Sequence, residues 1–149
     1  MNNTIKQGVI WGLLATVVMS IFMVTATLTG LSPMPAPIPM ALVKKVLGPM
    51  PKPVLIFLGI IAHLGYGGVA GGILGQLFKE RINLGIGLGW GVFLWLLMQV
   101  IFLPILGWGL FGSAITPKVA VATLILHLIY GITIGWGLQR KLQTTPVMP

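Results

Sequence analysis

The chain has 149 residues, of which 56% are hydrophobic and only 7% are charged, and its mean hydropathy is +1.03. These values lie outside the range of soluble globular domains and indicate an integral membrane protein. The chain has one acidic residue, Glu80, and no cysteine, which excludes paired-carboxylate catalysis, thiolate nucleophiles, disulfides and cysteine metal sites. We therefore expect no enzymatic activity.

The net charge of +8 does not indicate a nucleic-acid partner. The Lys and Arg residues are dispersed at the ends of apolar segments and form no basic stripe interleaved with aromatic residues. Anionic lipid head groups are the simpler expected partner of these charges.

Four apolar segments are long enough to cross a bilayer, which takes roughly 20 helical residues. They cover about residues 8–28, 54–78, 84–103 and 119–138. Helices are expected, because an open sheet cannot satisfy its backbone groups in lipid. The sequence therefore predicts an all-α membrane protein, with residues 1–149 forming a single transmembrane domain of four helices.

Prolines mark the expected ends of these helices, since proline is tolerated in the first turn but breaks a helix interior. Pro49, Pro51 and Pro53 precede the second segment, Pro104 ends the third, and Pro117 lies at the start of the fourth.

The loop between the first two spans is rich in proline and has an amphipathic core. This core covers residues 38–47 and carries Lys44 and Lys45. We expect a short interfacial helix that lies flat at the membrane surface, with both lysines among the lipid head groups.

The two halves of the chain resemble each other. At an offset of 64 residues, the second and fourth spans share six identical residues: His63, Leu64, Tyr66, Gly67, Gly71 and Leu74 match His127, Leu128, Tyr130, Gly131, Gly135 and Leu138. At an offset of 79, the first and third spans match: Trp11, Gly12 and Met19 fall on Trp90, Gly91 and Met98. These matches predict a tandem two-helix repeat, with units of about 8–78 and 84–141, whose histidines lie at similar depths.

Small residues recur at a spacing of four on every span, which places them on one helix face. The second span has Gly59, His63, Gly67, Gly71 and Gly75, and the fourth has Thr123, His127, Gly131, Gly135 and Gln139. The first has Gly8, Gly12, Thr16 and Ser20, and the third has Gly85 and Gly89 with Gly87 and Gly91 beside them. Such stripes favour close helix packing in lipid, in the manner of a glycine zipper.

The repeated His-x-x-Tyr-Gly has two interpretations. In the structural one, His63 and His127 form interhelical hydrogen bonds, with Thr16, Ser20 and Gln99 as available partners and Tyr66 and Tyr130 one turn away. In the other, the two histidines are the axial ligands of a haem b or bind a chlorophyll-type pigment, with Gly67 and Gly131 admitting the macrocycle. The structural interpretation is favoured, so we expect no cofactor.

A third interpretation makes the two repeats the halves of a small transporter or pore. The parallel repeat and the glycine-rich segment 85–91 suit such a protein, but no span carries a carboxylate or arginine for coupling.

Three segments carry a resemblance to a known group of proteins: PILGWGLFGSA at 104–114, HLIYGITIG at 127–135 and AHLGYGGVAGGILG at 62–75. They resemble a family of small, uncharacterised four-span membrane proteins of bacteria and archaea, which have His-x-x-Tyr-Gly in the second and fourth spans. The resemblance implies the same architecture, an unknown function and no assignment as an enzyme.

We expect a non-catalytic accessory or structural subunit that packs in a larger membrane assembly or a homo-oligomer. Five tryptophans are available for contacts with lipid, pigment or protein: Trp11, Trp90, Trp95, Trp108 and Trp136. The expected location is a prokaryotic cytoplasmic membrane. Both termini are expected in the cytoplasm, because Lys79, Arg81, Arg140 and Lys141 directly flank their spans.

Overall fold

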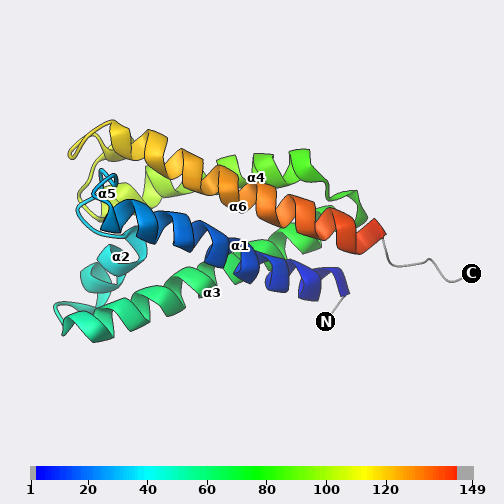
Figure 1. Ribbon diagram of the computed structural model, residues 1–149, viewed down its shortest axis with the longest axis horizontal. Helices are drawn as coiled ribbons and strands as arrows, with labels where there is room; N and C mark the ends of the chain where they lie inside the picture. The colour runs from blue at the N-terminus through cyan, green and yellow to red at the C-terminus, as the bar shows by residue number, and fades with distance from the viewer. Residues whose placement is uncertain (1–2, 144–149) are drawn as a thin grey trace, which may run out of the picture.

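The computed structural model describes residues 3–143, and within this range every regular element is helical. Four of its helical segments are long and apolar enough to cross a membrane: Asn3–Leu28, Lys52–Phe78, Leu84–Ile105 and Lys118–Lys141. They lie along one long axis, with the two chain ends at the same end of the bundle (Figure 1). The predicted all-helical architecture with four membrane-length helices is confirmed for the described residues.

Helices α1 (Asn3–Leu28), α3 (Lys52–Phe78) and α6 (Lys118–Gln143) are unbroken. A proline lies in the first turn of α3, where its missing N–H costs nothing, which explains why the helix starts at the prolines. A short 3₁₀ turn, η1 (Lys79–Arg81), leads from α3 to α4 (Leu84–Leu97). The Asn83 side chain begins α4 by accepting a hydrogen bond from the backbone N–H of Ile86 at 2.9 Å.

The third span changes its helical form near its end. α4 continues as a π-helical segment, η2 (Met98–Phe102), and as α5 (Leu103–Ile105), so the span reaches two residues beyond the predicted end at 103. Pro104 has no N–H and its ring would clash with the carbonyl of Val100 in a regular helix. The wider π turn accommodates this, and the Leu103 N–H donates to the Met98 carbonyl.

The chain leaves this span through a tight turn. Gly107 and Gly109 adopt φ values of +79° and +73°, and a 3₁₀ turn, η3 (Leu110–Gly112), leads on towards α6. Positive φ is readily accessible only to glycine, which accounts for the glycines at these positions.

The bundle consists of two helix pairs joined by a seam. α1 packs on α3, α4 packs on α6, and the two pairs meet where α1 contacts α6. Figure 1 shows α1 and α6 side by side in the middle of the molecule, with α3 crossing α1 and α4 crossing α6. At the seam, the Trp11 ring covers Gly137 and forms an edge-to-face contact with Trp136, with ring centroids 6.1 Å apart.

Glycines permit close backbone contact within each pair. A Cβ on Gly8 would clash with the backbone of Gly71, and one on Gly12 would clash with that of Gly67. In the second pair, a Cβ on Gly87 would clash with the backbones of Gly131 and Gly135, and one on Gly91 with the carbonyl of His127. The stripes therefore hold α1 to α3 and α4 to α6, and do not bring the two histidine-bearing helices together.

Some predicted packing residues have other neighbours. Gly75 lies against the backbone of Thr4, whereas Gly59 faces Met40 on the short helix α2 (Ile38–Leu47). Gly89 has no neighbour for a Cβ within 4 Å, and Gly85 has only the side chain of Asn83. Of the four glycines predicted for the stripe of the third span, Gly87 and Gly91 thus form the packing face, and Gly85 and Gly89 do not.

The helix predicted over residues 38–47 is present as α2, which packs on α3 at the end of the bundle away from the termini (Figure 1). Ile38 at its start is buried in a cluster with Met98, Leu103 and Val119. Lys44 and Lys45 are exposed. The apolar side of α2 therefore covers the end of the seam between the two helix pairs.

Candidate functional site

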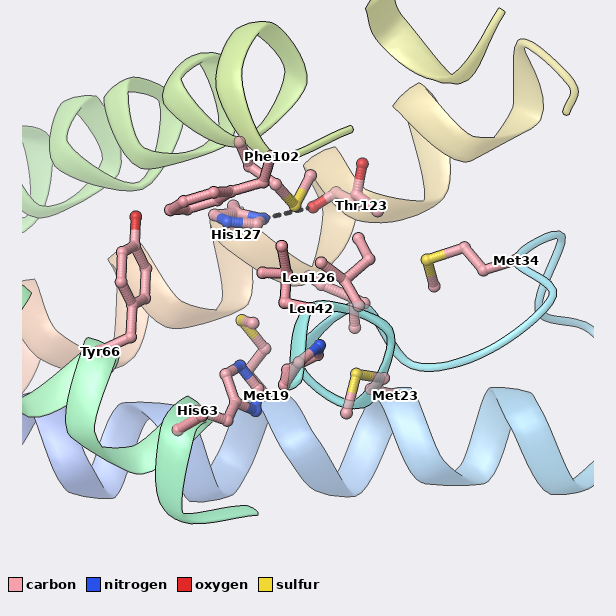
Figure 2. A pocket seen from close by; sticks show the side chains of 14 residues that line it. Met19, Met23, Met34, Leu42, His63, Tyr66, Phe102, Thr123, Leu126 and His127 are labelled. Carbon is pink, nitrogen blue, oxygen red and sulfur yellow. Dashed lines mark hydrogen bonds between the residues drawn. The ribbon is translucent and has the colours of Figure 1, made fainter. Parts of the chain in front are cut away.

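A cavity of about 260 Å³ lies between the two helix pairs. Its walls come from α1, α2, α3, η2 and α6, and most of the surrounding side chains are apolar (Figure 2). Four methionines line it: Met19, Met23, Met34 and Met98. Four polar side chains line it as well: His63, Tyr66, Thr123 and His127.

His127 is almost fully buried, with 7% of its surface exposed. Its Nδ1 lies 2.8 Å from the carbonyl oxygen of Thr123, one turn earlier on α6, and since a carbonyl only accepts, Nδ1 carries the proton and donates. An imidazolium would be costly in this apolar setting, so Nε2 of the neutral ring is an acceptor. Within residues 3–143, Nε2 has no hydrogen-bond partner.

His63 enters the cavity wall from α3, on the side opposite His127 (Figure 2). Its Nδ1 lies 3.1 Å from the hydroxyl oxygen of Ser20 on α1, one of the three partners expected from the sequence. As for His127, the described part of the chain provides no partner for Nε2. Each histidine therefore has one ring nitrogen held by the protein and one that is unpaired.

The two equivalent tyrosines have different surroundings. The Tyr130 hydroxyl donates to the Gly67 carbonyl at 2.8 Å and does not line the cavity. The Tyr66 hydroxyl is buried without a hydrogen-bond partner, and its ring meets Phe102 edge to face with centroids 5.8 Å apart. Figure 2 shows the Tyr66 side chain extending from α3 towards the side of the cavity where Phe102 and His127 lie.

A buried polar pair supports the cavity from behind. The Gln99 amide, fully buried on the π-helical segment, donates from Nε2 to Thr123 Oγ1 at 2.9 Å. Thr123 Oγ1 in turn donates to the Val119 carbonyl at 2.7 Å. This pair fixes η2 against the same turn of α6 that holds the His127 ring.

A second hollow, of about 480 Å³, lies between α1, α2 and α3. His63, Met23 and Pro39 line both this groove and the central cavity. The rest of the groove is mainly aliphatic, and Val17, Ile21 and Ile60 in its wall are about half exposed or more.

Of the six residues predicted to bind a cofactor, His63, Tyr66 and His127 line the cavity together. Gly67, Gly131 and Tyr130 instead lie in helix contacts. The methionines of the wall and Phe102 were not predicted from the sequence. The one available signal was that Met19 and Met98 occupy equivalent positions in the repeat.

The described residues contain no group of three or more His, Cys, Asp or Glu side chains that could hold a metal ion.

Comparisons with known proteins agree with the sequence resemblance in its broad form. A family model described as a family of unknown function (DUF6789) matches residues 2–147. Neither the curated proteins nor the solved structures provide a match.

Proposed function

We propose that this chain, which belongs to the family of unknown function DUF6789, is a non-catalytic integral membrane protein that binds a small, largely apolar molecule. The binding site in this proposal is the central cavity between the two helix pairs.

The observation that carries the proposal is the Tyr66 hydroxyl, which is buried without a hydrogen-bond partner on a residue that lines an apolar cavity. An unpaired buried hydroxyl costs about 1–3 kcal/mol, and a native fold retains few such groups without a reason. A ligand oxygen at this position relieves the cost. His127, whose Nε2 is an unpaired acceptor, lines the same cavity and is a second polar group for the same ligand.

The size and lining of the cavity suit a ring-sized ligand. In another protein, a dry apolar cavity of about 150 Å³ holds a benzene molecule, so 260 Å³ accommodates a substituted ring. The methionines of the wall favour binding too, because the flexible thioether adapts its shape to different apolar ligands.

A bis-histidine cofactor is the second candidate. Histidines that bind a metal usually donate their other ring nitrogen to a protein group, and the Nδ1 atoms of His63 and His127 are both held in this way. Haem b and chlorophyll-type pigments, however, need more room than this cavity offers, since pockets for large ligands approach the upper part of a range of roughly 300–1,000 Å³. An absorption spectrum of the purified protein decides between them: a Soret band that His127→Ala abolishes would establish the haem.

Both helix pairs pack through glycines, which supports the proposal that the chain is a tandem repeat. The register differs by one helical turn: Gly12 meets the Gly67 carbonyl, whereas its sequence equivalent Gly91 meets the carbonyl of His127 and not that of Gly131. In this proposal, α2 is an insertion into the first repeat and an interfacial helix, with exposed Lys44 and Lys45 among the head groups.

We further propose a prokaryotic cytoplasmic membrane as the location, with cytoplasmic termini, on the basis of the basic residues that flank the spans. The accessory-subunit role and the transporter alternative remain predictions. Co-purification of a partner from native membranes tests the first, and solute flux through reconstituted liposomes tests the second.

The binding proposal is tested by extracting the purified protein with organic solvent and identifying bound compounds by mass spectrometry. Ala62 lines the cavity from α3 and is itself exposed, so Ala62→Phe fills the cavity with little strain. We expect an apolar compound near one equivalent per chain in the wild type and its loss from Ala62→Phe. Val69→Phe, on the lipid-facing side of the same helix, is the control and should retain it. A compound absent from the wild type, or equally present in all three proteins, would contradict the proposal.

A further inference from the structure

The shape and chemistry of the two adjoining hollows define the bound molecule more closely. We propose that it has a hydroxyl-bearing head, which lies in the central cavity, and a hydrocarbon chain, which lies in the groove between α1, α2 and α3. This inference rests on the proposed function.

The two hollows adjoin each other. His63, Met23 and Pro39 line both, so the side chain of His63 stands at their junction. The central cavity holds about 260 Å³ and the groove about 480 Å³. A molecule with a compact head and a longer chain matches this division, whereas a compact ligand alone would leave the groove unused.

The groove opens towards the lipid-facing surface of the bundle. The aliphatic side chains of Val17, Ile21 and Ile60 are exposed on helices of membrane-spanning length, so in a bilayer they face acyl chains. A hydrocarbon chain in the groove contacts these side chains on one side and lipid on the other, and it exposes no apolar surface to water. The ligand thus reaches the cavity laterally from the bilayer.

Two unpaired polar groups define the chemistry of the head. His127 Nε2 can only accept a hydrogen bond, because Nδ1 carries the ring proton and donates it to Thr123. The Tyr66 hydroxyl is unpaired and able to donate. A ligand hydroxyl supplies both the donor that the first lacks and the acceptor that the second lacks. A ketone or an ether oxygen has no proton for His127.

Equilibrium binding of three synthetic probes tests the inference, with the full-length protein in lipid nanodiscs and empty nanodiscs as the background. The probes are 4-decylphenol, the chainless 4-ethylphenol and the methyl ether 4-decylanisole. After correction for partition into the bilayer, we expect 4-decylphenol to bind most tightly. The ether should bind about three- to tenfold more weakly, the range that one lost hydrogen bond produces.

Protein variants separate the head site from the chain site. Ile60→Trp obstructs the groove, and we expect it to weaken 4-decylphenol binding at least fivefold while leaving 4-ethylphenol unchanged. Tyr66→Phe should weaken both phenols. Val69→Trp, at an exposed position outside both hollows on the same helix, is the control for a new tryptophan. Thermal unfolding of every variant establishes that it is folded before binding is measured.

The outcomes distinguish this inference from the proposal beneath it. If 4-decylanisole binds as tightly as 4-decylphenol, the hydroxyl assignment is wrong. If Ile60→Trp leaves 4-decylphenol binding unchanged, the chain does not lie in the groove. In both cases a native compound that is lost from Ala62→Phe would still support the central cavity as a binding site. Loss of phenol binding together with the absence of any native compound would overturn both.

Discussion

The Tyr130 hydroxyl on α6 donates a 2.8 Å hydrogen bond to the Gly67 carbonyl on α3 and so connects one helix pair to the other. Its counterpart in the sequence, Tyr66, has a buried hydroxyl with no partner. The two tyrosines of the repeated motif therefore differ in role: Tyr130 holds the bundle together, and Tyr66 lines the cavity.

This difference predicts opposite effects of the same substitution. Tyr130→Phe should destabilise the protein by about 0.6 kcal/mol, and by about 1.7 kcal/mol at most, the range measured for hydrogen bonds between membrane helices. Tyr66→Phe removes an unpaired hydroxyl, so the ligand-free protein should be as stable as the wild type or slightly more stable. Reversible unfolding in mixed micelles measures both. Equal losses for the two variants would show that the Tyr66 hydroxyl is paired in solution.

The glycine contacts predict that the loss of stability caused by a Gly→Ala substitution depends strongly on its position. Gly71→Ala places a methyl group against the backbone of α1, where neither backbone can yield, and should cost about 1–3 kcal/mol or prevent folding. Gly65→Ala, on the same helix, meets open space and should be neutral. In the second pair, Gly91→Ala and Gly89→Ala should show the same contrast. Yield and thermal unfolding of the four variants provide the measurement, and damage from Gly65→Ala or Gly89→Ala would indicate an unseen packing surface.

The buried pair behind the cavity gives a third prediction. Thr123→Val keeps the side-chain shape but removes the acceptor of the fully buried Gln99 amide, which should cost about 1–3 kcal/mol. Thr133→Val is the matched control, because the Thr133 hydroxyl donates only to the Ile129 carbonyl of its own helix at 2.8 Å. A comparison of the two unfolding free energies isolates the Gln99 contact. Similar values would mean that the amide finds another partner.

The proposed orientation is tested by cysteine labelling, which the absence of native cysteine makes unambiguous. In cells that express the protein, a membrane-impermeant maleimide should label Lys45→Cys from outside. It should label Arg81→Cys only after the membrane is opened. The reverse pattern would place the termini outside.

Hydropathy and proline positions were sufficient to predict the long helices, and the Ile38–Leu47 helix was predicted with correct bounds. The π-helical segment was not predicted. Hydrophobic periodicity does not show how a helix relieves the clash between the Pro104 ring and the Val100 carbonyl. The pairing of the helices could not be predicted from the sequence either, because all four spans carry small residues. On the third span, two glycine rows compete, and only the tertiary contacts select Gly87 and Gly91.

The site was predicted in part. Spacing placed His63 and Tyr66 on one span and His127 on another, and the structure brings these three to one cavity. Tyr66 and Tyr130 occupy equivalent positions in the sequence repeat, but only Tyr130 forms a hydrogen bond across the seam. The methionine wall was not predicted, because methionine on an apolar helix has no distinctive spacing.

The pairing of α1 with α3 and of α4 with α6 also has a consequence for how the protein is made. Each glycine-packed pair consists of spans that follow each other along the chain, so the first pair can assemble in the bilayer while the ribosome is still producing the second. The seam between α1 and α6 needs the last span. The central cavity therefore forms only when synthesis is complete, so any molecule that enters it does so after the two pairs have docked.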